Sequence, residues 1–295
     1  MTAKPFAKWI GGKRRVAPAI VELMPRPIGC YAEPFLGGGA VLLQVLQTPG
    51  VLAPNATVLA SDCNLELVNA WRTVKHSAVS LAEQLRWFDE EAVGRGYSKF
   101  FYDLRAKPFS ASETLFSAAR TLWLNRNCFN GLYRVNKKGL FNAPIGDASA
   151  PRPWSRDNLL AVGELLRERR VAFSTCDFRQ AFINVAEADA DGAKVVYADP
   201  PYLPRSEASF VAYSKKGFGP DEHEELAAQA RRCRGSITTL LSNADTEFAR
   251  RLYEQNGARV VWSREAACVV GASKRRKMSD LLVRFGAQQE EEVAS

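Results

Sequence analysis

The stretch Ile28–Leu46, IGCYAEPFLGGGAVLLQVL, decides how this 295-residue chain folds. It begins with an apolar run typical of a buried strand, and its last part, Gly39–Leu46, has the apolar spacing of a helix. Three consecutive glycines, Gly37 to Gly39, join the two parts. Glycine permits a tight turn and a close approach of the backbone to a ligand. A strand, a glycine turn and a helix in this order predict one unit of a Rossmann-like α/β fold.

The same alternation continues along much of the chain. Short strand-like runs separated by helical periodicity predict a mostly parallel, seven-stranded sheet with helices on both faces. The predicted strands are Ile28–Pro34, Thr57–Ser61, Val171–Cys176, Lys194–Asp199, Ser236–Ser242, Ala258–Ser263 and Asp280–Phe285. The predicted helices include Gly39–Leu46, Arg156–Glu168, Pro220–Arg234 and Asp245–Gln255.

Residues 64–150 interrupt this alternation. The pattern is helical from Leu65 to about Asn127, and Leu132–Asn142 resembles a β-hairpin. We therefore predict a discontinuous α/β domain at 1–63 and 151–287, an inserted helical domain at 64–150 and an acidic tail at 288–295. Predicted buried residues of the insertion are Trp71, Leu85, Trp87, Phe88, Phe100, Phe101, Leu104, Leu115, Phe116, Leu122 and Trp123.

Composition narrows the classes of function. Hydrophobic residues make up 46% of the chain, as in globular proteins, and no apolar run reaches the roughly 18 residues of a membrane helix. The chain has six isolated cysteines and two histidines, which argue against a metal site and against a histidine base. We expect a cytoplasmic protein, encoded by a bacterium or phage, that is monomeric and holds no metal.

The net charge of +8 is concentrated in three clusters. Residues 1–21 and 114–146 contain several Lys and Arg and no acidic residue, and the second cluster is interleaved with aromatic residues. The third cluster is Lys274-Arg275-Arg276-Lys277. Basic clusters of this kind favour a polyanionic partner.

The tetrapeptide Asp199-Pro200-Pro201-Tyr202 follows a predicted strand, at the edge where ligands of open α/β sheets bind. A carboxylate and a backbone carbonyl can each accept one hydrogen of an exocyclic NH₂ group, which frees the nitrogen lone pair to attack. Tyr202 can stack on the ring. A rigid turn capped by Asp199 is the structural alternative. Asp62 ends the strand after the glycine turn, where an acidic residue can bind the two hydroxyls of a ribose.

These motifs together resemble the Dam-type N6-adenine DNA methyltransferases of the D12 class, over nearly the whole chain. Their order, with the glycine loop first and a target-recognition domain before the tetrapeptide, is that of the family. The matching segments are Lys8–Lys13, Glu33–Gly39, Ser61–Asn64, Leu124–Arg134, Phe141–Gly146, Asp199–Tyr202, Phe210–Tyr213 and Leu241–Asn243.

The resemblance implies S-adenosylmethionine as the cofactor and double-stranded DNA, with a flipped-out adenine, as the substrate. The implied catalytic residues are Asp199, Pro200, Pro201 and Tyr202. The implied cofactor-binding residues are Trp9, Lys13, Glu33, Pro34, Phe35, Gly37, Gly39, Asp62 and Asp199. The implied DNA-binding residues are Lys8, Arg126, Phe129, Asn130, Leu132, Arg134, Asn136, Lys137, Pro144, Lys274 and Arg275.

Within the DNA-binding set, Arg134 matches a residue that reads a guanine edge, and the set as a whole indicates GATC. Asn127-Cys128 and Asp147-Ala148 depart from the family's pattern, which leaves another adenine sequence open. Cytosine-N4 and protein glutamine methyltransferases share the fold but usually carry Ser and Asn, respectively, in place of Asp199. A catalytically silent DNA-binding protein is the alternative from another class, and the intact tetrapeptide argues against it.

Overall fold

The computed structural model describes residues 2–147, 149–152, 154–203, 218–269 and 275–286, with the backbone alone for 264–269 and 275–279. Phe210–Tyr213, Lys274 and the tail 288–295 lie outside the described residues. The chain divides into two compact units. Unit 1 comprises Met1–Val21, Gly37–Thr48 and Asp62–Thr175, and unit 2 comprises Glu22–Leu36, Pro49–Ser61 and Cys176–Ser295.

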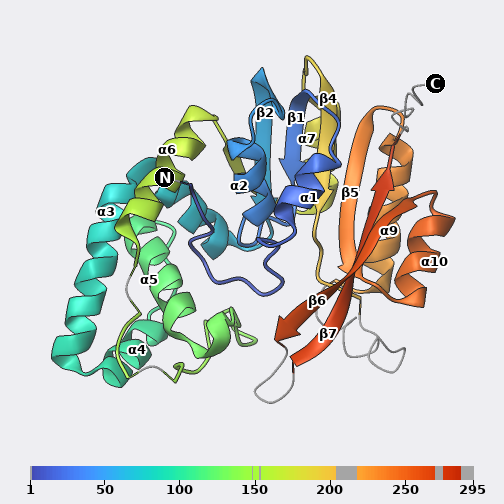
Figure 1. The fold of residues 1–295 in the computed structure, drawn as a ribbon. Helices are drawn as coiled ribbons and strands as arrows, with labels where there is room; N and C mark the ends of the chain where they lie inside the picture. The colour runs from blue at the N-terminus through green and yellow to red at the C-terminus, as the bar shows by residue number, and fades with distance from the viewer. Residues whose placement is uncertain (1, 148, 153, 204–217, 270–274, 287–295) are drawn as a thin grey trace. The chain divides into compact units, whose positions relative to one another are not determined.

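Seven strands form one sheet in the order β3-β2-β1-β4-β5-β7-β6 (Figure 1). The pairs β1–β2, β1–β4 and β4–β5 are parallel, whereas β7 is antiparallel to both β5 and β6. The predicted seven-stranded α/β sheet is therefore confirmed. The strands are β1 (Ile28–Glu33), β2 (Leu52–Asp62), β3 (Ala172–Thr175), β4 (Ala193–Ala198), β5 (Ile237–Ala244), β6 (Arg259–Val269) and β7 (Arg275–Phe285).

The core of unit 2 follows from the two-residue repeat of its strands. Cys30 and Ala32 of β1 and Val196 and Ala198 of β4 lie in one buried cluster with side chains of α7, α9 and α10. The alternate residues, such as Tyr31, are also fully buried. Both faces of the central strands are therefore covered, which explains why these strands have continuous apolar sequences.

β6 and β7 are longer than predicted. The sequence indicated strands at 258–263 and 280–285, but the two strands pair over their full lengths, as far as Val269 opposite Arg275. The charged residues 274–277 hide the strand pattern. From Arg275 onward the antiparallel partner nevertheless satisfies the backbone groups, because a ladder does not depend on apolar side chains.

Unit 1 is built around the long helix α3, which packs against α4, α5 and α6. Trp71 and Trp123 are fully buried, as predicted, but the prediction for Trp87 was wrong because that residue is 46% exposed. Leu115 and Phe116 are only partly buried. The helices are α1 (Ala17–Glu22), α2 (Ala40–Gln47), α3 (Leu65–Arg95), α4 (Tyr97–Ala106), α5 (Thr114–Asn127), the 3₁₀ turn η1 (Phe129–Gly131), α6 (Arg156–Glu168), α7 (Phe178–Glu187), α9 (Pro220–Cys233) and α10 (Glu247–Gln255).

Four of the helices begin at a polar side chain that accepts a hydrogen bond from the first turn. These caps are Asn64 for α3, Ser155 for α6, Asp177 for α7 and Thr246 for α10. Each cap satisfies a backbone N–H group that has no partner within the helix, and such caps typically contribute about 1 kcal/mol.

The predicted hairpin at 132–142 is present as a tight turn with very little strand. Val135 and Phe141 form a single antiparallel bridge, and Asn136 N–H donates to the Leu140 carbonyl at 2.8 Å. Gly139, with φ of +75°, occupies the left-handed position of the turn. Residues 134–140 of the turn are exposed, whereas Phe141 is buried. The backbone bonds and the burial of Phe141 therefore set the shape of the turn together.

Candidate functional site

The ends of β1 and β4 mark the point where the order of the strands reverses. The chain runs from β1 to β2 on one side, and from β4 to β5 on the other. The two strands are parallel and in register at Ala32 and Val196, so they end side by side. Glu33 and Asp199 therefore lie at the same edge of the sheet within unit 2. Open α/β sheets bind their ligands at such an edge.

Two carboxylates contribute negative charge to this edge. The hydroxyl of buried Tyr31 donates to Glu33 Oε2 at 2.8 Å. Burial raises the pKa of Tyr197 well above its usual value, and the charges of Asp199 and Glu33 raise it further. Both carboxylates therefore lie close enough to Tyr197 to raise the pKa of its hydroxyl. Their combined negative charge favours a cationic ligand.

The glycine loop of unit 1 is held by Asp62 and Trp71. Gly37 N–H donates to Asp62 Oδ2 at 3.1 Å, and Asn64 N–H donates to Oδ1 of the same carboxylate at 2.9 Å. The Trp71 indole N–H donates to the Gly37 carbonyl at 3.1 Å. Burial raises the pKa of Asp62, and the two backbone bonds oppose that shift. Asp62 thus orders the loop, and its binding of a ribose stays a prediction.

Trp9 explains why Gly37 must be glycine. A Cβ atom on Gly37 would lie 2.7 Å from Cδ1 of the indole, and the φ of this residue is +48°. The Trp9 ring also stacks on Tyr133, with the ring centroids 5.6 Å apart. Trp9 therefore joins the glycine loop to the beginning of the 132–142 turn. Lys13, four residues after Trp9, is also buried, and its ammonium donates to the Gly11 carbonyl at 2.8 Å.

Arg134 is held in a defined direction on the exposed turn. Its Nε donates to Asn142 Oδ1 at 2.7 Å, and its Nη2 donates to the Asn142 carbonyl at 2.8 Å. Together these bonds use one side of the guanidinium. The outer fork of the guanidinium, formed by the N–H groups of Nη1 and the second N–H of Nη2, points away from Asn142 and has the geometry that suits a guanine edge. Asn136, Lys137 and Pro144 are also exposed in this region.

Asn125 fastens Lys8 to the loop that follows α5. Lys8 N–H donates to Asn125 Oδ1 at 2.9 Å, and Asn125 Nδ2 donates to the carbonyls of Lys8 and Gly131 at 2.8 and 3.0 Å. Beside Gly131, Asn130 is exposed in the left-handed conformation with φ of +53°, and Phe129 is partly buried. The N-terminal and central basic clusters thus meet within unit 1.

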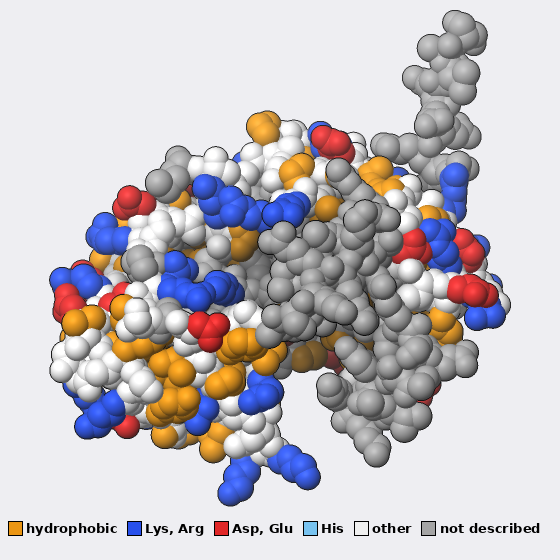
Figure 2. Space-filling view, turned by 60° about the horizontal axis from the view of Figure 1, so that its bottom comes forward, with side chains coloured by type: hydrophobic (Ala, Val, Ile, Leu, Met, Phe, Trp, Pro, Cys, Tyr) orange, Lys and Arg blue, Asp and Glu red, His pale blue; other side chains and the backbone are white. Residues whose placement is uncertain are grey.

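Some cationic groups of unit 1 are exposed, and others are partly buried and hydrogen-bonded within the protein. Burial lowers the pKa of the Lys8 ammonium, and the charges of Arg152 and Arg126 lower it further. These three cations therefore lie near one another. Arg126 is half-buried, because its Nε donates to the Arg152 carbonyl at 3.1 Å and its guanidinium lies over the Trp154 ring. Figure 2 draws one face of the molecule, on which Lys and Arg side chains form several groups.

Arg120 is the exception within the central basic cluster, because it does not reach the surface. It is 1% exposed, and its Nη1 lies 3.3 Å from Glu66 Oε2. Thr121 Oγ1 donates to the same oxygen at 2.8 Å. Arg120 belongs to the 114–146 basic cluster by sequence, but its buried side chain does not add to the surface charge of that cluster. A buried cation needs a paired anion, and here that anion is 54 residues away in the sequence.

The backbone of the tetrapeptide rests on a buried polar network in unit 2. His223 Nε2 lies 2.9 Å from the Pro201 carbonyl, and His223 Nδ1 lies 2.9 Å from the Tyr253 hydroxyl. Asn243 Nδ2 donates to that hydroxyl at 2.7 Å, and Asn243 Oδ1 accepts from Leu203 N–H at 3.0 Å. The network residues His223, Asn243 and Tyr253 have no solvent exposure.

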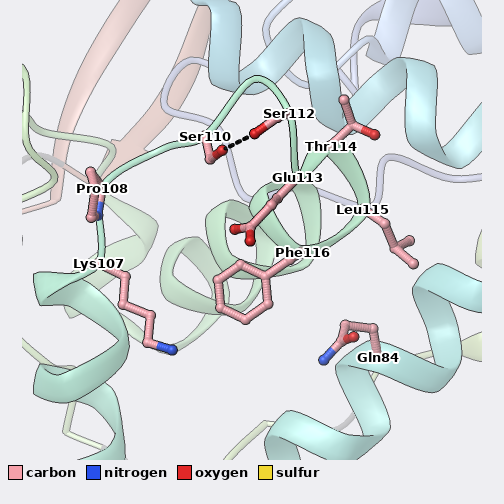
Figure 3. A pocket seen from close by; sticks show the side chains of 9 residues that line it. All are labelled: Gln84, Lys107, Pro108, Ser110, Ser112, Glu113, Thr114, Leu115 and Phe116. Atoms are coloured by element: carbon pink, nitrogen blue, oxygen red, sulfur yellow. Dashed lines mark hydrogen bonds between the residues drawn. The ribbon is translucent and has the colours of Figure 1, made fainter.

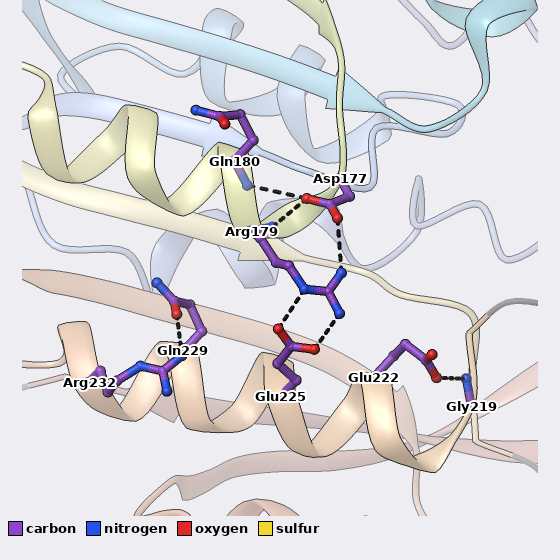
Figure 4. Close-up of polar contacts among 8 residues, drawn as sticks. All are labelled: Asp177, Arg179, Gln180, Gly219, Glu222, Glu225, Gln229 and Arg232. Carbon is purple, nitrogen blue, oxygen red and sulfur yellow. Dashed lines mark hydrogen bonds and ion pairs between the residues drawn. The ribbon is translucent and has the colours of Figure 1, made fainter.

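The sequence-based search did not find His223 or Tyr253. Asn243 belongs to the matching segment Leu241–Asn243, which is the only signal that pointed to this network. His223 lies in the first turn of α9, three residues after the proline that begins the helix. In the same turn Glu222 Oε2 accepts from Gly219 N–H at 2.6 Å (Figure 4). Arg179 of α7 donates from Nε to Glu225 of α9 at 2.5 Å, and this bond holds α7 against α9 (Figure 4).

A pocket beside the loop between α4 and α5 contains none of the predicted site residues (Figure 3). In its lining the Ser110 and Ser112 hydroxyls are 2.9 Å apart, and the Lys107 ammonium lies 5.1 Å from the centre of the Phe116 ring. Within the described ranges there is no cluster of three potential metal-ligating side chains and no helix of membrane-spanning length and hydropathy. Arg275 is described by its backbone alone.

Comparisons with known proteins assign the family. The model of the D12 class N6 adenine-specific DNA methyltransferases matches residues 9–267. The chain is 32% identical to the Type II methyltransferase M.MjaIII of Methanocaldococcus jannaschii, over 96% of this chain and 99% of that one. It is also 32% identical to the DNA adenine methylase of Haemophilus influenzae, over 97% and 94% of the two chains. The chain therefore belongs to the D12 class N6 adenine-specific DNA methyltransferases.

Proposed function

We propose that this enzyme transfers a methyl group from S-adenosylmethionine to N6 of a flipped-out adenine in double-stranded DNA, within GATC. The observation that carries the proposal is the position of Asp199-Pro200-Pro201-Tyr202, directly after β4 and beside the end of β1. We further propose that it acts as a monomer in the cytoplasm, and that the domain division at residues 63/64 and 150/151 separates catalysis from target recognition.

The features of the glycine loop fit S-adenosylmethionine. Gly37 and Gly39 both have positive φ, which turns the backbone sharply between β1 and α2. Glu33 and Asp199 supply negative charge at the edge of the sheet, which suits a cofactor with a sulfonium and an ammonium group. We propose Asp62 as the residue that binds the ribose, using lone pairs beyond those that accept from the loop. When bound, the cofactor supplies an activated methyl group on positively charged sulfur.

The tetrapeptide then performs three tasks in the proposed mechanism. The Asp199 carboxylate and the Pro200 carbonyl accept the two N6 hydrogens, which orients the nitrogen lone pair toward the methyl group. Tyr202 stacks on the flipped base and offsets part of the few kcal/mol that flipping costs. Asp199, or water, would accept the proton that N6 gives up when it is methylated. Orientation of this kind can correspond to about 10⁵ M or more in effective concentration.

Recognition in this proposal depends on the exposed turn of unit 1. The outer fork of Arg134 reads one guanine, while Leu132 and Pro144 contact neighbouring bases. Lys8, Arg126 and Lys137 contact phosphates or the outer base pair, and Phe129 with Asn130 supports the base left without a partner. The defined direction of Arg134 supports this assignment, because a bidentate contact requires a fixed guanidinium plane.

The test is nucleoside mass spectrometry of two duplexes incubated with S-adenosylmethionine, identical except that GATC is scrambled in one. We expect N6-methyladenine in the GATC duplex alone. Methylation of both duplexes would refute the assigned recognition residues but keep the chemistry. N4-methylcytosine, or no methylation of either duplex, would refute the proposed reaction. Isothermal titration with the cofactor would then separate a silent DNA-binding protein from one that lacks only its target.

A further inference from the structure

We propose that His223 is a positioning residue, which acts with Asn243 and Tyr253 to fix Tyr202 through the two peptide groups that flank it. The inference rests on the proposed catalytic function of the tetrapeptide. It concerns residues that do not touch the substrate themselves. All of them lie in unit 2.

The direction of each hydrogen bond in the network follows from chemistry. A carbonyl oxygen only accepts, so His223 Nε2, 2.9 Å from the Pro201 carbonyl, must carry the ring proton. Nδ1 of the neutral ring is then an acceptor, and the Tyr253 hydroxyl at 2.9 Å donates to it. Asn243 Nδ2 in turn donates to the Tyr253 oxygen. The result is a one-way chain of donors from Asn243 to the Pro201 carbonyl.

The two ends of this chain hold the two peptide groups around Tyr202. His223 binds the carbonyl of the Pro201–Tyr202 peptide, and Asn243 Oδ1 accepts from the N–H of the Tyr202–Leu203 peptide at 3.0 Å. Asn243 Oδ1 also accepts from Ala244 N–H at 2.8 Å, which fixes the amide itself. Because both adjacent peptide planes are fixed, the direction of the Tyr202 Cα–Cβ bond is fixed as well.

The surroundings keep His223 neutral, as the chain of donors requires. The ring is fully buried, and the edge-to-face contact with Phe218 has centroids 4.8 Å apart. Burial lowers the pKa of His223 to about 4. A protonated ring would carry a second N–H on Nδ1, which would oppose the donating hydroxyl of Tyr253. In this state the Nε2–H group holds the Pro201 carbonyl, and the Nδ1 lone pair is already taken by the Tyr253 hydroxyl.

Two substitutions separate this function from mere support of the fold. His223→Gln keeps a donor for the Pro201 carbonyl and an acceptor for Tyr253, whereas His223→Leu keeps similar bulk without either. We expect His223→Gln to retain kcat within about threefold. We expect His223→Leu to lower kcat by tenfold or more, with KM for S-adenosylmethionine within about twofold. A higher KM for S-adenosylmethionine with an unchanged kcat would overturn the proposal.

A double variant tests whether His223 acts through Tyr202. His223→Leu should cause little further loss in an enzyme that already carries Tyr202→Ala, because the ring to be positioned is gone. Losses that simply multiply would show that His223 acts elsewhere and would overturn the proposal.

Nuclear magnetic resonance tests the network without relying on activity. The chain has two histidines, so a His76→Gln variant assigns the ring signals of His223 directly. We expect a neutral ring with the proton on Nε2 at pH 7, and a proton on Nδ1 would refute the inference even if His223→Leu does not fold. A wild-type enzyme that transfers no methyl group would refute the proposed function instead, since the tautomer reports on the network alone.

Discussion

Replacing Gly37 by alanine perturbs the contact between the glycine loop and Trp9. The new Cβ atom would lie 2.7 Å from the indole Cδ1, whereas ordinary contact begins at 3.4 Å, so the ring must move by at least about 0.7 Å. Overpacking of this kind costs about 1–3 kcal/mol. The positive φ of the residue costs a further 1–2 kcal/mol or so. We therefore expect Gly37→Ala to lower the free energy of unfolding by about 2–5 kcal/mol.

Gly50 provides the matched control. Its φ is +73°, but a Cβ atom there would meet nothing within 4 Å. Gly50→Ala should therefore show the backbone cost alone, about 1–2 kcal/mol. Because Trp9 is a proposed cofactor residue, Gly37→Ala should also weaken S-adenosylmethionine binding by tenfold or more, and Gly50→Ala should leave it unchanged.

Urea denaturation and isothermal titration of both variants measure these two quantities. Combining Gly37→Ala with Trp9→Ala should remove the excess cost, so that the alanine at 37 then costs no more than the alanine at 50. Equal losses of stability for Gly37→Ala and Gly50→Ala in the wild-type background would refute the reasoning. Unchanged cofactor binding in Gly37→Ala would separate Trp9 from the cofactor site.

The remaining predictions concern catalysis, recognition and pH. Asp199→Ala should abolish methyl transfer while specific DNA binding, measured by fluorescence anisotropy, is retained; near-normal turnover would exclude its assigned role. Arg134→Ala should reduce discrimination at one guanine by about 1–3 kcal/mol. Asn142→Ala should reduce it less, because only the side-chain bond to Arg134 Nε is lost while the bond to the main-chain carbonyl remains. Unchanged relative rates of methylation on single-base variants of the site would contradict both predictions. Since the pKa of His223 falls from 6.5 to about 4 on folding, the unfolded chain binds more protons between these values, and stability is lost as pH falls through this window. Between pH 7 and pH 5 the wild type should lose about 2 kcal/mol more than His223→Gln in urea titrations, and parallel losses would show that His223 does not titrate as described.

Much of the fold could be read from local patterns. The apolar runs that end at Glu33 and Asp199 indicated two strands, and the glycines after the first indicated the turn. Side-chain direction repeats every two residues in a strand and every 3.6 in a helix, so a local stretch already carries the pattern of its own burial. The order of the strands, their antiparallel edge and the full length of the β6–β7 pair do not follow from such patterns, because they depend on which strands meet.

The candidate site divides in the same way. Sequence alone determined the chemical groups available, such as the carboxylate and tyrosine of the tetrapeptide and the guanidinium of Arg134. Only the tertiary structure decided which of these groups are buried, oriented or paired. Arg120 looked like one more surface cation but is paired with Glu66 inside the protein. His223 looked irrelevant to catalysis but lies behind the tetrapeptide. Hydrogen-bond partners 22 and 54 residues apart are chosen by packing and by the high cost of an unpaired polar group in the interior, and neither is written in a local stretch of sequence.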